Sequence, residues 1–172
     1  MKYDLLRILL VDDNQFIRVM VREILRSVGV QKIYEARDGA EGLQIMRDHE
    51  VDVVMTDLSM QPLDGIDFVR LLRNSPDSPN MMAPVIMITA HSTLARVKEA
   101  RDAGVSEILT KPLTARGVIE RLHQAIEFPR PFVRCDDYFG PDRRRKDDPK
   151  FEGPWRRHTD PPYLRNAPKP RV

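Results

Sequence analysis

Residues 6–13 read Leu-Arg-Ile-Leu-Leu-Val-Asp-Asp, a short aliphatic run that stops at two adjacent carboxylates. Its length and its aliphatic composition predict a buried strand. Similar runs recur along the chain, and each is followed by a segment with apolar residues at helical spacing. The further predicted strands are residues 32–36, 51–56, 84–88 and 107–110.

This alternation of strands and helices predicts an α/β domain. Nearly continuous aliphatic strands indicate burial on both faces of a parallel sheet. Right-handed crossovers place helices on both sides of such a sheet. The expected fold is therefore a doubly wound, five-stranded parallel sheet.

The composition changes near residue 128. Residues 1–128 carry a net charge of −3, whereas residues 129–172 carry +5 and hold nine of the 14 prolines. Proline fixes φ and removes an amide donor, so this density argues against helix or sheet. We therefore divide the chain into a domain at 1–128 and a Pro/Arg-rich tail at 129–172. The tail is expected to lack regular structure, either disordered or docked as a linear segment.

Several classes of protein are excluded by what the sequence lacks. The 172 residues contain no apolar run of about 18 residues, which excludes a membrane-spanning helix. The first residues do not resemble a signal peptide. A single cysteine, Cys135, excludes an internal disulfide, and the four histidines lack metal-ligand spacing. The expected location is the cytoplasm, without membrane contact.

Four of the five predicted strands end at polar residues. Asp12 and Asp13 follow the first strand, and Asp57 follows the third. Thr89 and Lys111 follow the fourth and the fifth. Open α/β sheets bind ligands at this edge. Clustered carboxylates repel one another and recruit a cation, and an all-oxygen set suits Mg²⁺. One carboxylate could then attack a phosphoryl group, with the ammonium and the metal balancing charge.

These residues identify a family. The domain resembles the CheY-like response-regulator receiver domains of two-component signalling, over about residues 5–127. The resemblance implies the flavodoxin-like strand order 2-1-3-4-5. The matching motifs, in chain order, are Val11-Asp12-Asp13-Asn14, Thr56-Asp57-Leu58-Ser59-Met60, Leu63-Asp64-Gly65, Ile88-Thr89-Ala90 and Thr110-Lys111-Pro112.

The resemblance implies a role for each acidic residue. Asp57 is expected to accept phosphate from a histidine kinase or a histidine phosphotransfer protein. Asp13 and Asp57, with the backbone carbonyl of Ser59, are expected to hold Mg²⁺. Asp12 is expected to assist in metal binding, largely through water.

The remaining site residues are expected to bind or report the phosphoryl group. Thr89 and Lys111 would contact it, and the peptide bond after Lys111 is implied to be cis. Ser59 and His91 are expected near the mouth of the pocket, where they could tune dephosphorylation. The family often has an aromatic switch residue three positions before the lysine, and here that residue is Ile108.

The predicted function is that of a stand-alone response regulator in a phosphorelay. Its output is expected through protein–protein contacts of the fourth helix, the fifth strand and the last helix, or through the tail. It is not expected to be an enzyme acting on an outside substrate. Two alternatives stay open: a phosphate sink for a shared kinase, and a nucleic-acid-linked regulator acting through the basic residues 143–146 of the tail. Nucleic-acid binding is the less favoured reading, because prolines exclude a helix-turn-helix and aspartates interrupt the basic run.

Overall fold

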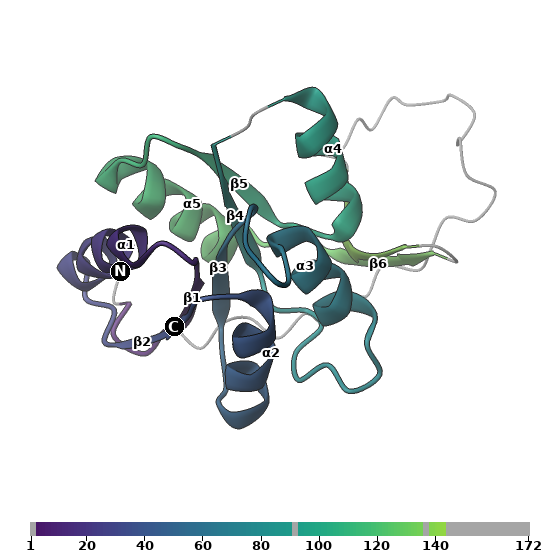
Figure 1. Cartoon of the computed structure of the whole chain (residues 1–172), viewed down its shortest axis with the longest axis horizontal. Helices are drawn as coiled ribbons and strands as arrows, with labels where there is room; N and C mark the ends of the chain where they lie inside the picture. Colours follow the sequence, from purple (N-terminus) through teal and green to yellow (C-terminus); the bar gives the residue numbers. More distant parts are fainter. Residues whose placement is uncertain (1–2, 91–92, 136–137, 144–172) are drawn as a thin grey trace.

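The computed structural model describes residues 3–90, 93–135 and 138–143 (Figure 1). Strands and helices alternate through the first 127 residues, and two short strands follow. The elements are β1 (Arg7–Val11), α1 (Gln15–Ser27), β2 (Lys32–Ala36), α2 (Gly39–Asp48), β3 (Val53–Asp57), α3 (Gly65–Asn74), β4 (Val85–Thr89), α4 (Leu94–Ala103), β5 (Glu107–Thr110), α5 (Ala115–Glu127), β6 (Phe132–Cys135) and β7 (Tyr138–Pro141).

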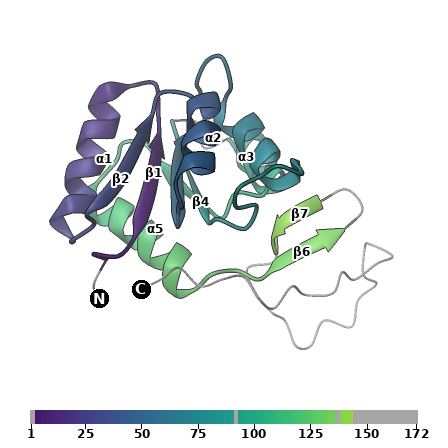
Figure 2. The same cartoon turned by 90° about the horizontal axis from the view of Figure 1, so that it is seen from below.

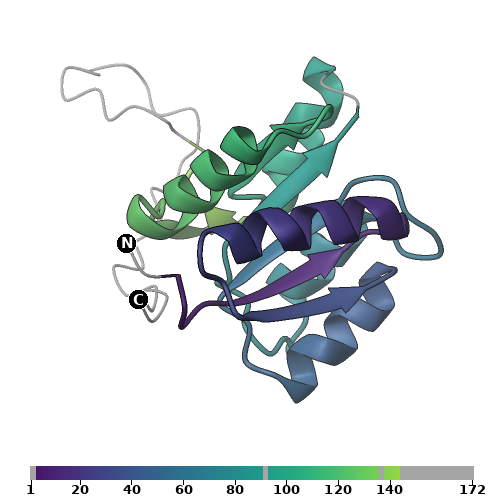
Figure 3. The ribbon, with the colours of Figure 1, turned by 90° about the vertical axis from the view of Figure 1, so that its left-hand side faces the viewer.

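The main sheet is parallel and has the order β2-β1-β3-β4-β5, which confirms the predicted fold class. Helices cover both of its faces. Figure 3 shows α1 and α5 side by side on one face. On the other face α2 packs against α3, and α3 against α4. Among the described residues, no helix has the length and apolar character needed to cross a lipid bilayer.

Two hydrophobic clusters, one on each face, hold these layers together. Side chains alternate between faces along a strand, so β1 sends Leu9 to the α2–α4 side and Ile8 to the α1–α5 side. In β3, Val54 likewise lies on the α2–α4 side and Met55 on the α1–α5 side. All residues of β3 and β4 are buried, as expected of central strands in a doubly covered sheet.

Polar side chains cap the N-termini of four helices and anchor the loops that precede them. Asn14, Asp38, Asp64 and Thr114 each accept a hydrogen bond from a backbone N–H in the first turn of the helix that follows. Such caps satisfy donors that the helix itself leaves unpaired. Since these helices begin just after loops at the carboxyl ends of strands, the caps also anchor the loops that line that edge of the sheet.

The expectation that the chain lacks regular structure after residue 128 is wrong for residues 132–135 and 138–141. Strands β6 and β7 form an antiparallel hairpin, with Phe132 opposite Pro141 and Arg134 opposite Phe139 (Figure 2). The prolines do not prevent this pairing, because two of them precede β6 and Pro141 is the last residue of β7. Proline is tolerated at strand ends and in edge strands.

The hairpin packs on the main domain through its aromatic residues. Phe132, Tyr138 and Phe139 are all buried, and β7 lies against α3 and α4. A Cβ on Gly140 would lie 2.9 Å from the Cα of Gly104, so the two backbones approach as closely as glycine allows. Burial of these three aromatic side chains thus offsets the low strand propensity of the prolines.

A buried arginine lies beneath the hairpin. Arg73, from the last turn of α3, is fully buried and donates hydrogen bonds to the carbonyl oxygens of Met81, Ala83 and Gly104. Its guanidinium carbon lies 5.0 Å from the ring centroid of Phe132. Burial lowers the pKa of Arg73 to about 9, so the group is still charged at neutral pH. The three carbonyl oxygens and the aromatic face provide the partners that a buried cation requires.

Two further arginines attach the hairpin to the end of α4 and the start of β5. Arg130 donates to the carbonyl oxygen of Ser106, and Arg143 forms an ion pair with Asp102 at 3.0 Å. The basic run 143–146 lies outside the described residues except for Arg143, as do all residues from 144 to 172. The predictions made for that part of the tail, and the domain boundary at residue 128, therefore stay predictions.

Candidate functional site

The polar residues singled out at the strand ends lie along one edge of the sheet. Asp57 and Thr89 are the last residues of β3 and β4. Asp12 follows β1 directly, and Lys111 follows β5. Since all of these strands run in parallel, their carboxyl ends meet at the same edge. The sheet therefore brings an acidic group, a hydroxyl and an ammonium group together from segments far apart in the chain.

Asp57 is the central carboxylate of this site, and both of its oxygens are engaged. Only 5% of the residue is exposed. Its Oδ1 lies 2.7 Å from Nζ of Lys111, and its Oδ2 accepts a hydrogen bond of 2.9 Å from the backbone N–H of Ser59. A charged donor on one oxygen and an amide on the other hold the carboxylate in one orientation.

Asp12 has a different environment, because one of its oxygens lacks a hydrogen bond. Its Oδ1 accepts from the backbone N–H of Asn14 at 2.8 Å. Its Oδ2 is buried without a hydrogen-bond partner, and Nζ of Lys111 is 4.0 Å away. Burial, together with the nearby charges of Asp57 and Asp13, raises the pKa of Asp12 to about 6, despite opposing effects of the Asn14 hydrogen bond and Lys111. An unsatisfied buried oxygen of this kind is costly, and a bound cation would satisfy it.

The donor set fits a hard divalent cation. Asp13 and Ser59 are exposed beside the buried Asp12 and Asp57. In the described ranges, no three Asp, Glu, His or Cys side chains converge in a preformed metal cage. Mg²⁺ does not require one, since it usually binds one or two carboxylates and keeps several waters. The orphaned oxygen of Asp12 and the exposed carboxylate of Asp13 are compatible with such a site.

The residues expected to respond to the phosphoryl group have distinct surroundings. Thr89 is buried, with 3% of its surface exposed. The peptide bond after Lys111 is cis, as the family resemblance implied. Ile108 is half-buried and packs against the cluster on the α2–α4 side of the sheet. His91 lies outside the described residues, so its predicted place at the pocket mouth is untested.

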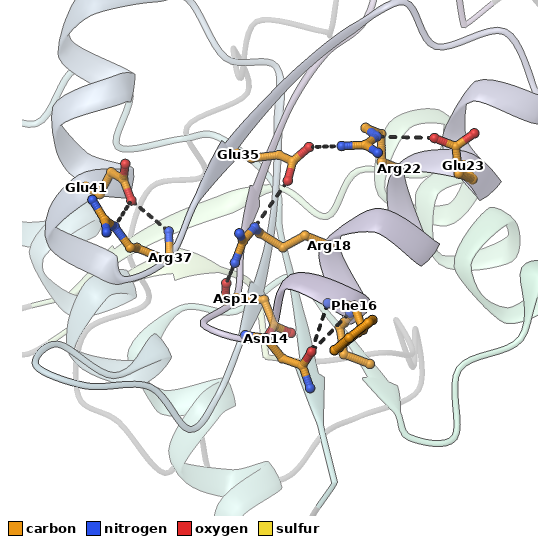
Figure 4. A network of polar contacts seen from close by, with 10 residues as sticks. Asp12, Asn14, Phe16, Arg18, Arg22, Glu23, Glu35, Arg37 and Glu41 are labelled. Carbon is orange, nitrogen blue, oxygen red and sulfur yellow. Dashed lines mark hydrogen bonds and ion pairs between the residues drawn. The ribbon is translucent and has the colours of Figure 1, made fainter.

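Sequence reasoning missed an arginine that contacts the acidic turn. Nη1 of Arg18, in α1, donates to the carbonyl oxygen of Asp12 at 2.5 Å (Figure 4). Its Nε donates to Glu35 on β2 at 3.2 Å. A polar residue on an amphipathic helix is normally expected to face solvent, so the helical pattern gave no indication that Arg18 contacts the Asp12 turn. The same helix carries Phe16, which is 86% exposed next to the site.

This arrangement is suited to accepting a phosphoryl group. A carboxylate is already a nucleophile, and here it lies against an ammonium group that can neutralise phosphoryl oxygens. Water reaches Asp13, Ser59 and part of Lys111, so a donor group could enter from that side.

Comparison with known proteins agrees with this geometry. Residues 8–126 match the family model described as the response regulator receiver domain. The chain is 34% identical over 122 residues to chemotaxis protein CheY-3 of Vibrio cholerae, covering 71% of this chain and 92% of that protein. It is 33% identical over 120 residues to transcriptional regulatory protein PdtaR of Mycobacterium tuberculosis, covering 70% of this chain and 56% of that protein.

A similar fold occurs among solved structures. The structure of chemotaxis protein CheY4 of Vibrio cholerae superposes with a TM-score of 0.65 at 28% identity, covering 70% of this chain and 98% of that one. The β6–β7 hairpin lies beyond the residues that the family model matches.

Proposed function

Since this chain belongs to the response-regulator receiver family, we propose that Asp57 accepts a phosphoryl group from a histidine kinase or a histidine phosphotransfer protein. The chain then signals by binding another protein. The observation that carries the proposal is the buried Asp57 carboxylate, which lies 2.7 Å from Nζ of Lys111 and beside the orphaned oxygen of Asp12.

The proposed reaction is an in-line transfer. An oxygen of Asp57 forms a bond to phosphorus as the bond from phosphorus to the donor imidazole nitrogen breaks, and that nitrogen keeps the electron pair. Lys111 donates to the phosphoryl oxygens and offsets their charge. Asp12, Asp13, Asp57 and the carbonyl of Ser59 would hold Mg²⁺, which supplies further positive charge to the same oxygens when bound.

Phosphorylation of Asp57 changes the hydrogen-bond partners of Lys111, and this change links the site to the rest of the domain. In the free protein its ammonium group is bound to Asp57. A phosphoryl group on Asp57 brings new oxygens that compete for Lys111 and for the hydroxyl of Thr89. We propose that this shifts an existing equilibrium of α4, β5 and α5, with Ile108 moving as an aliphatic side chain instead of an aromatic one.

Phe16 is proposed to form part of the surface that meets the phosphodonor. Its side chain is 86% exposed in the first turn of α1, two residues after Asn14 at the acidic turn. A large exposed aromatic residue next to a reactive site favours protein contact. Phe16→Ala should therefore slow transfer from a phosphorylated protein donor and leave transfer from acetyl phosphate unchanged. Equal slowing with both donors would contradict this role.

Intact-mass spectrometry tests the acceptor. The full chain is incubated with Mg²⁺ and acetyl phosphate beside Asp57→Asn and the matched control Asp67→Asn, which makes the same change at an exposed residue of α3. We expect one added phosphoryl group in the wild type and in the Asp67 variant. An adduct that persists in Asp57→Asn would place the acceptor elsewhere and refute the proposal. A parallel incubation with EDTA in place of Mg²⁺ should yield no adduct, because the metal is required for the transfer itself.

A further inference from the structure

We propose that Arg18 is a positioning residue for the acidic turn, and that Glu35 keeps it in place. Through this contact Arg18 would set the affinity of the site for Mg²⁺. The inference rests on the proposed function, since it assumes that the Asp12–Asp13 turn binds the metal. It concerns side chains outside the acidic cluster itself.

The main chain of Asp12 is held from both sides. Its N–H donates to the carbonyl oxygen of Ala36, the last residue of β2, at 3.0 Å. Its carbonyl oxygen accepts from Nη1 of Arg18 at 2.5 Å. Figure 4 shows the guanidinium of Arg18 between the Asp12 turn and Glu35. The turn is thereby attached to the edge strand on one side and to α1 on the other.

This attachment bears directly on Asp13. The carbonyl of Asp12 belongs to the peptide unit that joins it to Asp13, so the plane of that unit directs where the Asp13 side chain starts. Asp13 is exposed, and burial does not confine its side chain. A ligand on an exposed turn binds a metal well only if its backbone is already oriented. Fixing the Asp12 carbonyl is the way this fold provides that orientation.

Glu35 in turn holds the guanidinium. Its Oε2 lies 3.2 Å from Nε of Arg18, and its Oε1 lies 2.6 Å from Nη1 of Arg22, one turn further along α1. Burial alone would raise the pKa of Glu35, but hydrogen bonds from Arg22 and Arg18 outweigh it and keep the pKa below its usual value. The side chains of Arg18 and Glu35 are only 16% and 27% exposed, so solvent competes weakly with the pair.

Positioning and simple charge effects predict opposite results, which makes the inference testable. Arg18 is a cation near a cation site, so removal of its charge alone would tighten Mg²⁺ binding. Loss of its hydrogen bond to Asp12 would loosen binding, because the turn is freed. Supporting groups around a metal ligand typically affect affinity by about 10-fold or more.

The experiment is a calorimetric titration of the full chain with MgCl₂ for the wild type, Arg18→Gln and Arg22→Gln. The two variants lose the same charge from the same helix, but only Arg18 contacts the Asp12 carbonyl. We expect Arg18→Gln to weaken Mg²⁺ binding by about 10-fold and Arg22→Gln by less than about twofold. Unchanged or tighter binding in Arg18→Gln would overturn the inference.

A double-mutant cycle gives a second readout that does not depend on one variant. Glu35→Gln should weaken Mg²⁺ binding by about threefold in the wild type and have little further effect in Arg18→Gln, because it acts through that arginine. Equal weakening in both backgrounds would mean a long-range charge effect and would refute positioning. Circular dichroism and thermal unfolding in EDTA establish that each variant is folded.

The titrations also separate this inference from the proposed function. If the wild type binds no Mg²⁺, the proposed metal site fails. If the wild type and all variants bind equally, the metal site stands and only the role of Arg18 is wrong.

Discussion

The β6–β7 hairpin should stabilise the receiver fold, and Phe132→Ala tests this most directly. Phe132 begins β6 and is 3% exposed. Its ring lies 5.0 Å from the guanidinium carbon of Arg73 and 5.5 Å from the ring of Phe139. Phe128, at the end of α5, makes the matched control, since it is the same residue type but 61% exposed.

The expected magnitude follows from these contacts. Truncating a buried phenylalanine to alanine costs about 3–5 kcal/mol of unfolding free energy, from lost transfer energy and the remaining cavity. The hairpin residues lie outside the two main hydrophobic clusters, so if the truncation undocks the hairpin, the loss is limited to the free energy of its docking. We therefore expect about 3 kcal/mol for Phe132→Ala. Phe128→Ala should cost less than about 1 kcal/mol, because its ring is mostly in water.

Urea denaturation followed by far-UV circular dichroism measures both variants. A two-state transition at a lower midpoint is expected for Phe132→Ala, with that of Phe128→Ala near the wild type. Deletion of residues 129–172 should cost at least as much as Phe132→Ala. If the two phenylalanine variants differ by less than about 0.5 kcal/mol, the hairpin is not docked in solution and the reasoning is refuted.

Three other predictions follow from buried or crowded groups. Without metal, Asp12→Asn should raise stability at neutral pH by about 1–3 kcal/mol, because burial raises the pKa of Asp12 to about 6 and ionisation then opposes folding. The gain should shrink as the pH falls below about 6 and vanish only well below about 4, where the carboxyl is protonated in both states; a constant gain in urea titrations would contradict this. Burial also raises the pKa of Tyr138, so wild-type stability should fall as the pH rises above 10, and Tyr138→Phe should lack that part of the loss. Gly65→Ala would place its Cβ 2.0 Å from the carbonyl oxygen of Asp57, so it should cost more than about 2 kcal/mol and reduce phosphoryl uptake. Gly29→Ala has open space around it but a φ of +99°, and should cost only about 1 kcal/mol with uptake unchanged.

The main sheet and its helices could be predicted from the sequence, because hydrophobic runs and helical spacing are local features of the chain. Each aliphatic run became a strand of the main sheet, and β1, β3, β4 and β5 end at or just before the polar residues expected there. A parallel sheet then gathers its strand ends without further information. This is why Asp57 and Lys111, 54 residues apart, could be assigned to one site before their 2.7 Å contact was known.

The hairpin could not be predicted from the sequence, because the strongest local signal in that segment, its proline content, argues against strands. Proline density argues against regular structure, yet burial of Phe132, Tyr138 and Phe139 against α3 and α4 outweighs it. The burial of Arg73 could not be predicted for a similar reason. A cation in the last turn of a helix normally interacts with solvent and with the helix C-terminus, and only the folded chain shows it buried on three carbonyl oxygens.

By itself the sequence determined the strand and helix pattern, the parallel sheet and the set of residues at its carboxyl edge, because each depends on periodicity and on strand direction. Only the tertiary structure decided which oxygen of Asp12 is left without a partner, which arginine holds the acidic turn, and where the chain after α5 packs. These features depend on contacts between segments distant in sequence. Their free energies come from burial and from paired charges, which the spacing of residues along the chain does not encode.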